Sequence, residues 1–159
     1  MSRLTIRDRR PGDLQGCADV LRAVHEADAY PLNWPADPQR WLTPPRLLRA
    51  WIAEDADGTI AGHVAVQDSV DDRAELSRLF VAPAARRRSV ASALVRHVRS
   101  WAAEHSYGLM LEVAEERRSA AVDFYEATGW QPVGASDADW ATADGRPVRL
   151  RRYVLETES

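Results

Sequence analysis

Lysine is missing from this chain of 159 residues, in which all 21 basic residues are arginine. Without lysine, a phosphate-binding loop of the Gly-x-x-x-x-Gly-Lys type is excluded, and no Gly-x-Gly-x-x-Gly fingerprint for dinucleotides occurs. Cys17 is the only cysteine. An intrachain disulfide and a Cys-x-x-Cys metal or redox site are therefore ruled out, and we expect no bound metal.

Long apolar runs are also absent. No window approaches the ~18 apolar residues that a membrane span needs, and residues 1–7 lack the apolar stretch of a signal peptide. The net charge of −3 gives no reason to expect a nucleic acid as partner. These absences predict a cytoplasmic protein that binds neither nucleic acid nor membrane, folded as a single domain over residues 1–159.

Three consecutive arginines follow an apolar strand pattern in the middle of the chain. The strand pattern of Leu79–Val81 ends at Pro83, and Arg86–Arg88 then precede an amphipathic helix that begins near Val90. A helix start carries positive partial charge, so arginines there are unfavourable unless an anion binds. The run therefore indicates a phosphate-bearing ligand, with a solvated arginine cluster as the alternative.

Hydrophobic periodicity and turn residues predict an α+β protein with the element order β-α-(α)-β-β-β-α-β-α-β-β. The predicted strands cover residues 4–8, 50–54, 59–66, 75–81, 109–113, 130–134 and 148–155. The predicted helices cover residues 13–28, 90–101 and 119–128, with short helical turns near 39–42 and 46–48. Residues 29–38, rich in proline and aromatics, and the polar residues 137–144 are expected to form loops.

Two motifs carry a resemblance to a known family. Residues Arg86–Ala91 read Arg-Arg-Arg-Ser-Val-Ala, close to the pattern (Gln/Arg)-x-x-Gly-x-(Gly/Ala), and Ala121–Trp130 follow Ala-x-x-x-Tyr-x-x-x-Gly-(Phe/Trp). With both motifs in this order and one strand between them, the chain resembles the GNAT superfamily of acyl-CoA-dependent N-acetyltransferases over nearly its whole length. It departs from the usual pattern at Ser89 and Arg87, which replace glycines, and at Arg118, which replaces an asparagine.

The resemblance implies a GNAT-like fold, with a central mixed, mostly antiparallel sheet of six to seven strands flanked by about four helices. It also implies transfer of an acetyl group from acetyl-CoA to a primary amine of a small molecule or peptide. Acetyl-CoA and an amine acceptor are therefore the expected partners. The habit of the family further suggests a homodimer through the terminal strands.

For the acetyl donor, the resemblance implies contacts with the strand and with the arginine loop. Backbone groups of Leu79 and Val81 would pair with the pantetheine arm, and a backbone N–H near Phe80 or Val81 would polarise the thioester carbonyl. Loop amides would hold the pyrophosphate at the helix start. The expected donor-binding residues are Leu79, Phe80, Val81, Arg86, Arg87, Arg88, Ser89, Val90, Ala91 and Ser92.

Two residues are candidates for the proton transfers. Tyr125 is the candidate general acid, because a phenol is protonated at neutral pH and can donate to a departing thiolate. Glu75 is the candidate base, acting through water. The alternatives are that Tyr125 is a core aromatic beside Phe124, and that Glu75 is a surface carboxylate paired with Arg73 or Arg78. His63 could take the proton instead if it faces the cleft, but a histidine in an apolar strand can equally be structural.

The acceptor side is expected at the proline-rich loop. Tyr30, Trp34 and Trp41 could hold an apolar or cationic acceptor, and His63 is a further candidate for acceptor binding. Alternatively, the aromatic residues only pin the loop to the core. The leading hypothesis is thus an N-acetyltransferase; the alternative is a degenerate acyl-CoA-binding protein without efficient catalysis, which the replaced loop glycines favour. A nucleotide-binding enzyme and a nucleic-acid module are the less favoured alternatives.

Overall fold

The computed structural model describes residues 4–28, 30–31, 33–69, 72–86, 88–114, 124–142 and 144–155. Its strands are β1 (Thr5–Asp8), β2 (Leu47–Glu54), β3 (Ile60–Asp68), β4 (Arg73–Val81), β5 (Gly108–Ala114), β6 (Gln131–Ala141) and β7 (Pro147–Leu155). Its helices are α1 (Leu14–Asp28), α2 (Pro38–Trp41) and α3 (Val90–Glu104), and two short 3-10 helices are η1 (Pro11–Asp13) and η2 (Pro83–Ala85). Residues 124–127 form one further helical turn.

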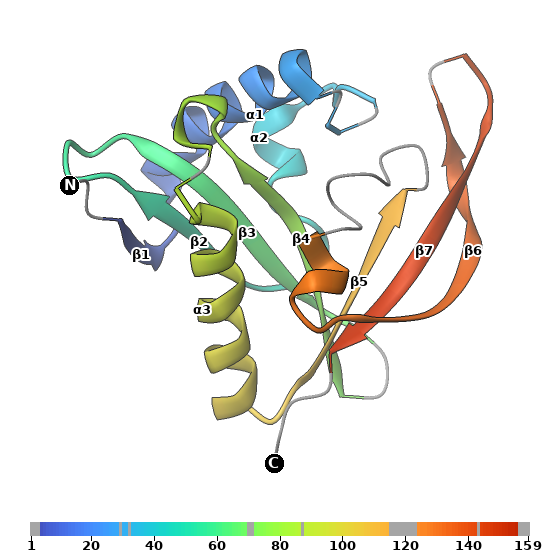
Figure 1. Cartoon of the computed structure of the whole chain (residues 1–159). Helices are drawn as coiled ribbons and strands as arrows, with labels where there is room; N and C mark the ends of the chain where they lie inside the picture. The colour runs from blue at the N-terminus through green and yellow to red at the C-terminus, as the bar shows by residue number, and fades with distance from the viewer. Residues whose placement is uncertain are drawn as a thin grey trace.

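All seven strands join one sheet in the order β1-β2-β3-β4-β5-β7-β6 (Figure 1). Neighbouring strands are antiparallel except β4 and β5, which are parallel. The prediction of a mixed, mostly antiparallel sheet flanked by about four helices is confirmed. Among the described residues, no helix is both long and apolar enough to cross a membrane.

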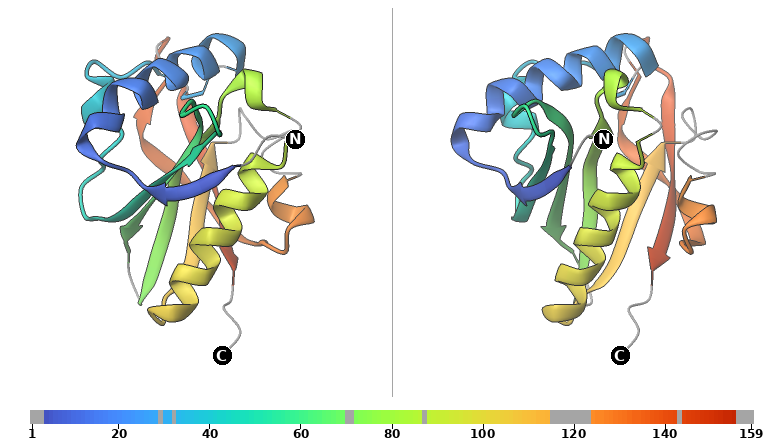
Figure 2. Two further views of the ribbon diagram at one scale, coloured as in Figure 1. Left: turned by 90° about the vertical axis from the view of Figure 1, so that its left-hand side faces the viewer. Right: turned by 60° about the vertical axis from the view of Figure 1, so that its left-hand side comes forward.

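Helices α1 and α3 cover opposite faces of the sheet, with α1 across one end and α3 along the strands (Figure 2). Side chains alternate between the two faces of a strand, and β2 shows this directly. Trp51 packs in the cluster that includes Val90 and Leu94 of α3, whereas the next residue, Ile52, packs with Leu21 of α1. The alternation of apolar residues along β2 thus places a helix on each side.

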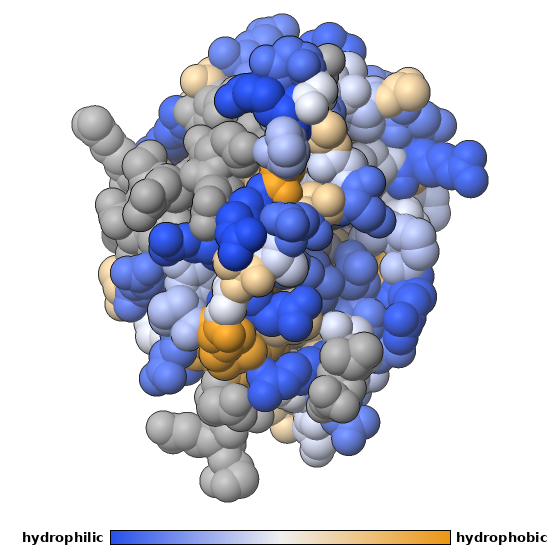
Figure 3. Space-filling view, turned by 90° about the vertical axis from the view of Figure 1, so that its right-hand side faces the viewer, coloured by the Kyte–Doolittle hydropathy of each residue, from blue (hydrophilic) through white to orange (hydrophobic). Residues whose placement is uncertain are grey.

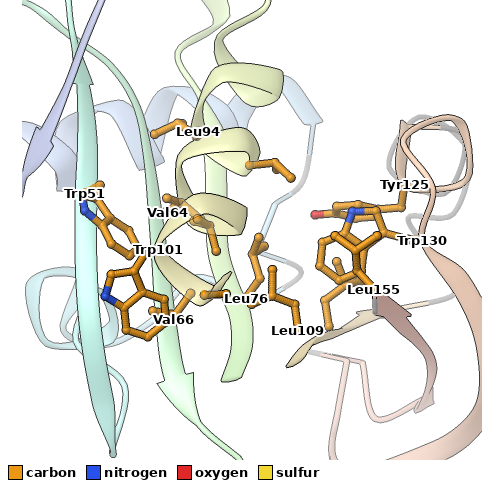
Figure 4. Packing of buried hydrophobic residues seen from close by; sticks show 14 of the residues in the cluster. Trp51, Val64, Val66, Leu76, Leu94, Trp101, Leu109, Tyr125, Trp130 and Leu155 are labelled. Carbon is orange, nitrogen blue, oxygen red and sulfur yellow. The ribbon is translucent and has the colours of Figure 1, made fainter. Parts of the chain in front are cut away.

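The larger of the two cores combines aliphatic and aromatic side chains (Figure 4). The rings of Trp51 and Trp101 meet edge to face at 5.8 Å between centroids, and those of Tyr125 and Trp130 do so at 5.7 Å. Gly62 lets α3 approach β3 closely, because a Cβ there would lie 2.9 Å from Val90 Cγ1. This close approach fixes where α3 begins relative to the sheet.

Strand β4 pairs over a long stretch with β3 but over a short one with β5. It pairs with β3 from Ala74 to Val81, but its register with β5 covers only Arg73–Glu75. Beyond Glu75 the two strands diverge, so that a gap in the hydrogen-bonded sheet opens toward the start of α3 (Figure 1). The side chains around this divergence form the candidate site.

Two sequence predictions are corrected by the structure. Leu47 and Leu48 belong to β2 and not to a helical turn, because β2 extends its pairing with β3 as far as Gln67. Asp137 and Asp139 lie in β6, not in a loop, because β6 pairs with β7 up to Ala141. The predicted helix over residues 119–128 begins outside the described residues.

The face of the molecule that presents β6 and β7 is mostly hydrophilic, with a small apolar patch (Figure 3).

Candidate active site

A cleft of about 1020 Å³ opens where β4 and β5 diverge. Its walls come from the loop after α1, β4, the first turn of α3, β5, residues 124–125 and the β6–β7 hairpin. The cleft brings together five residues predicted to catalyse the reaction or to bind the acceptor, which are Tyr30, Trp34, Trp41, Glu75 and Tyr125. Leu79, Val81 and Ala91, predicted to bind the donor, also line it, whereas His63 does not.

One part of the cleft lies along β4 and reaches the start of α3, where the donor-binding residues are expected. Leu79 and Val81 line it from β4, and Ala91 lines it from the first turn of α3. The Phe80 side chain points elsewhere: it is 4% exposed and stacks on His63 within the core under α1. Only the backbone of Phe80 therefore remains a candidate for contact with a ligand.

The arginine loop has a left-handed turn at its end. Ser89, the residue before α3, has φ of 59°, the conformation for which glycine is usually required. Serine therefore adopts the backbone shape that the glycine of the family motif would favour. The N–H groups of Val90, Ala91 and Ser92 lie in the first turn of α3, where a helix leaves its amides without intrahelical partners.

The three arginines of this loop have different surroundings. Arg88 forms a bidentate pair with Asp55 of the β2–β3 turn, with its Nη1 2.9 Å from Asp55 Oδ2. The pair lowers the pKa of the Asp55 carboxyl. Arg86 is exposed at the end of η2, and Arg87 lies outside the described residues. Arg88 thus anchors the loop to the sheet, which the arginine run by itself did not indicate.

Tyr125 lies at the edge between core and cleft. Its side chain is 8% exposed, and its ring contacts those of Phe124, at 5.3 Å, and Trp130. The same residue lines the cleft, opposite β4. Tyr125 therefore combines the two interpretations offered by the sequence, because it is packed as a core aromatic and is also accessible from the cleft.

Glu75 lies in the cleft at the point where β4 leaves β5. Burial raises the pKa of its carboxyl above the usual value, and repulsion from Glu112 on β5 raises it further. The Arg78 and Arg152 guanidinium groups oppose this rise. Glu112 also lines the cleft and lies 3.8 Å from Arg152. The sequence does not single out Glu112, although a charged residue inside the apolar strand 109–113 is a signal that could have done so.

Aromatic residues form the opposite wall. Tyr30 meets Trp41 edge to face at 6.0 Å, and the Arg22 guanidinium lies 4.7 Å from the Trp34 ring centroid. Asn33 Nδ2 donates a hydrogen bond of 2.8 Å to the carbonyl of Ala141 at the end of β6. This bond joins the aromatic loop to the β6–β7 hairpin, so the two together close one side of the cleft. Trp140, which is 42% exposed, lines it from the hairpin.

His63 does not line the cleft. It is fully buried between Phe80, Arg9 and the β4 backbone, where Nδ1 donates to the Arg78 carbonyl at 2.8 Å and Nε2 accepts from Arg9 Nη1 at 3.0 Å. Burial lowers the pKa of its imidazole to about 3. Both ring nitrogens are engaged and no face of the ring meets the cleft, which corrects the expectation that His63 binds the acceptor.

Comparison with known proteins agrees with this geometry. The profile of the acetyltransferase (GNAT) family matches residues 16–130, which include β4, the arginine loop, α3 and Tyr125. The chain belongs to the GNAT family. The match spans both motifs on which the resemblance was based, from Arg86–Ala91 to Ala121–Trp130.

Curated relatives of this GNAT chain act on different molecules by name. Peptidyl-lysine N-acetyltransferase YiaC of Escherichia coli is 34% identical over 108 residues, which are 67% of this chain and 65% of that protein. N-acetylaspartate synthetase of mouse (Mus musculus) is 33% identical over 103 residues, 64% of this chain. The chain spans only 34% of the length of the mouse enzyme.

Solved GNAT structures share the whole fold. The ribosomal-protein-S18-alanine N-acetyltransferase of Escherichia coli matches with a TM-score of 0.77 and 21% identity, covering 99% of this chain and 96% of the other. Spermidine N-acetyltransferase of Vibrio cholerae, in complex with CoA and spermine, matches with a TM-score of 0.76 and 20% identity over 97% of this chain and 95% of the other. At these identities the structures establish the fold.

Proposed function

We propose that this GNAT protein transfers an acetyl group from acetyl-CoA to a primary amine of a small molecule or peptide. One observation carries the proposal: a single cleft joins the diverging edge of β4, the start of α3, a tyrosine and a carboxylate with a raised pKa. These are the parts that acyl transfer to an amine requires. Their coincidence in one cleft is better explained by catalysis than by packing.

The shape of the cleft fits an extended, amide-containing donor. Beyond Glu75, β4 has diverged from β5, so backbone groups of Leu79 and Val81 can pair with the pantetheine arm as an added strand would. The first-turn amides of α3 suit the negatively charged pyrophosphate. Acetyl-CoA supplies an activated acetyl group, and a backbone N–H near Phe80 or Val81 would stabilise the charge that develops on its carbonyl oxygen.

In the proposed reaction, Glu75 accepts a proton from the ammonium form of the acceptor, through a water molecule. The lone pair of the freed amine forms the new C–N bond, the C–S bond breaks, and its electron pair leaves on sulfur. Tyr125 donates its proton to that sulfur, and the proton lost by the nitrogen as the amide forms restores the phenol through solvent. The products are the N-acetylated acceptor and CoA.

The donor site is tested by thermal shift of the purified protein with acetyl-CoA, CoA or ATP. A ligand that binds the folded state alone raises the melting temperature. We expect both CoA compounds to raise it and ATP to have little effect. Arg86→Glu, beside the start of α3, should reduce the shift, whereas the matched charge reversal Arg96→Glu on the exposed side of α3 should not. No shift at millimolar acetyl-CoA would contradict the proposal.

Acetyl transfer itself is tested by thiol release from acetyl-CoA with a panel of amines. The panel should contain free amino acids, amino acid amides, polyamines and lysine-containing peptides, because the curated relatives act on different acceptors by name. Release of thiol that depends on an amine, with the N-acetylated product found by mass spectrometry, would support the proposal. Binding of acetyl-CoA without turnover on any amine would favour a degenerate acyl-CoA-binding protein.

A further inference from the structure

Arg78 enters the cleft at a distortion of β4. Between the register pairs His63–Phe80 and Ala65–Ser77, β4 carries one residue more than β3, and Arg78 there has φ of 54°. Arg78 lines the cleft and also a neighbouring hollow of about 460 Å³, which borders α2. A bulge of this kind redirects a side chain, and here the result is a guanidinium at the junction of the two hollows.

Trp41 holds this guanidinium in place. The ring of Trp41 lies 4.2 Å from the guanidinium carbon, and Arg78 Nε donates a hydrogen bond of 2.9 Å to the Trp41 carbonyl. Cation–π stacking and one hydrogen bond fix the plane of the group. A fixed guanidinium plane favours bidentate recognition of a carboxylate, which a flexible lysine would not provide.

The charge of Arg78 is incompletely balanced by the protein. Burial lowers the pKa of the guanidinium, while Tyr30 and Glu75 favour its charged form. Among the described residues, no carboxylate forms an ion pair with Arg78. A partly desolvated cation without a paired anion is costly, so a site of this kind gains stability when an anion binds.

The rest of the cleft has the opposite charge. Glu75, Glu112 and Asp139 line it, and among the described residues Arg78 is the only cation that does so. Glu75 and Arg78 are three residues apart on one strand, which is at most about 10 Å along the chain. The carboxylates suit the ammonium form of an acceptor, and the guanidinium suits an anion located a short distance away on the same molecule.

We infer that the acceptor is a small primary amine that carries a carboxylate, such as a free amino acid, and that Arg78 binds this carboxylate. The inference rests on the proposed acetyltransferase function and names its substrate class. Polyamines fit less well, because a second ammonium group would lie beside Arg78. A peptide acceptor lacks a free carboxylate next to its reacting amine, unless the amine belongs to a terminal or acidic residue.

The test compares each free amino acid of the panel with its α-amide, in wild type and in Arg78→Gln. An amide has the more readily deprotonated amine, so preference for the acid must come from recognition. We expect wild type to turn over at least one amino acid with kcat/KM about tenfold or more above that of its amide. In Arg78→Gln this preference should vanish through a higher KM for the acid, with similar kcat. Arg78→Lys should retain part of the preference for the acid. Arg40→Gln, which changes an arginine that lines the neighbouring hollow, should retain all of it.

A binding measurement separates failure of this inference from failure of the proposed function. Amino acids and their amides are titrated into the CoA-loaded protein while its melting temperature is followed. The inference alone would be overturned if amides, polyamines or peptides were acetylated as efficiently as the acids and Arg78→Gln left these rates unchanged. No turnover, but binding of acids that depends on Arg78, would overturn the proposed function and retain the carboxylate site. Neither turnover nor selective binding would overturn both.

Discussion

Strand β4 borders two regions that differ in how completely their polar groups are satisfied. On the β3 side, the pairing runs from Ala74 to Val81, and His63 makes two hydrogen bonds while fully buried. On the β5 side, pairing stops at Glu75, and the groups there face a cleft. The paired region satisfies its polar groups within the protein, whereas the divergent region presents charged groups to the cleft.

The pKa shifts follow this division. Burial lowers the pKa of His63, which stays neutral and serves as a hydrogen-bonding link between Arg9 and β4. Burial and a neighbouring carboxylate raise the pKa of Glu75, as is common for groups that exchange protons in active sites. Changes in the divergent region should therefore affect activity and spare stability. Changes in the paired region should do the reverse.

The largest effect is expected from Tyr125→Phe. Removing the hydroxyl leaves the ring to pack against Phe124 and Trp130 but takes away the proposed proton donor. We expect kcat to fall by about 10²- to 10⁴-fold, with the thermal shift by acetyl-CoA retained. Steady-state kinetics measured by thiol release would show it.

Tyr107→Phe is the matched control for Tyr125→Phe. It removes a hydroxyl from a ring that stacks on Trp101, away from the cleft, and should leave kcat unchanged. An unaltered kcat in Tyr125→Phe would show that Tyr125 is a core aromatic alone. It would leave the leaving thiolate to be protonated by water.

In the paired region, His63 should make stability depend on pH. Its pKa of about 3 in the folded protein lies below the ordinary 6.5, so the unfolded chain binds the extra proton first. Its contribution is therefore full above about pH 6.5 and is lost as the pH falls toward 3, by about 1.4 kcal/mol per pH unit. Urea unfolding at several pH values would measure this slope.

His63→Gln removes the titrating group and should flatten that slope. At pH 7 the variant should be less stable by about 1–3 kcal/mol, because Arg9 and the Arg78 carbonyl lose their well-placed partner. His105→Gln, at an exposed position just after α3, is the control for loss of an imidazole outside the paired region. Equal slopes in wild type and His63→Gln would mean that His63 is not held neutral. The kcat of His63→Gln should change little, since His63 lies outside the cleft.

A smaller effect is expected on the pH profile of the divergent region. Glu75 must be deprotonated to accept a proton, so kcat/KM, corrected for the fraction of free amine, should fall as the pH drops through its raised pKa. Glu75→Gln should remove this dependence and lower the rate. Glu112→Gln removes the repulsion that raises the pKa, so the fall should move to lower pH. A profile that neither substitution alters would assign the proton to water.

The sequence indicated the fold because its evidence is local. Alternating apolar residues, the turn at residues 55–58 and the two motifs each lie within short segments of the chain. The site was only partly predictable because its chemistry depends on contacts distant in sequence. Pairing of Arg88 with Asp55 and of His63 with Arg9 joins residues 33 and 54 positions apart. No spacing rule anticipates these.

Arg78 illustrates the same limit. Strict alternation would place it on the face opposite Leu79, yet both residues line the cleft, because β4 has a bulge at this point. A bulge of one residue leaves no trace in the apolar pattern of 75–81. The residue that we infer to bind the acceptor carboxylate was therefore not predicted from the sequence, except as a partner for Glu75.

The smallest expected effect concerns the end of the arginine loop, where a stability measurement tests whether the backbone at Ser89 is strained. Ser89→Gly should raise the free energy of unfolding by about 0.5–1 kcal/mol, because glycine adopts the left-handed φ of 59° without the steric cost of a side chain. Ser92→Gly, three residues later within α3, should lower it by about 0.5 kcal/mol, since the same change costs stability in a helix. Opposite signs in urea unfolding would show that the turn is strained. If Ser89→Gly were also destabilising, the serine would be making a stabilising contact that outweighs its strain. The thermal shift by acetyl-CoA should survive Ser89→Gly, because the backbone amides that we propose to face the pyrophosphate are kept.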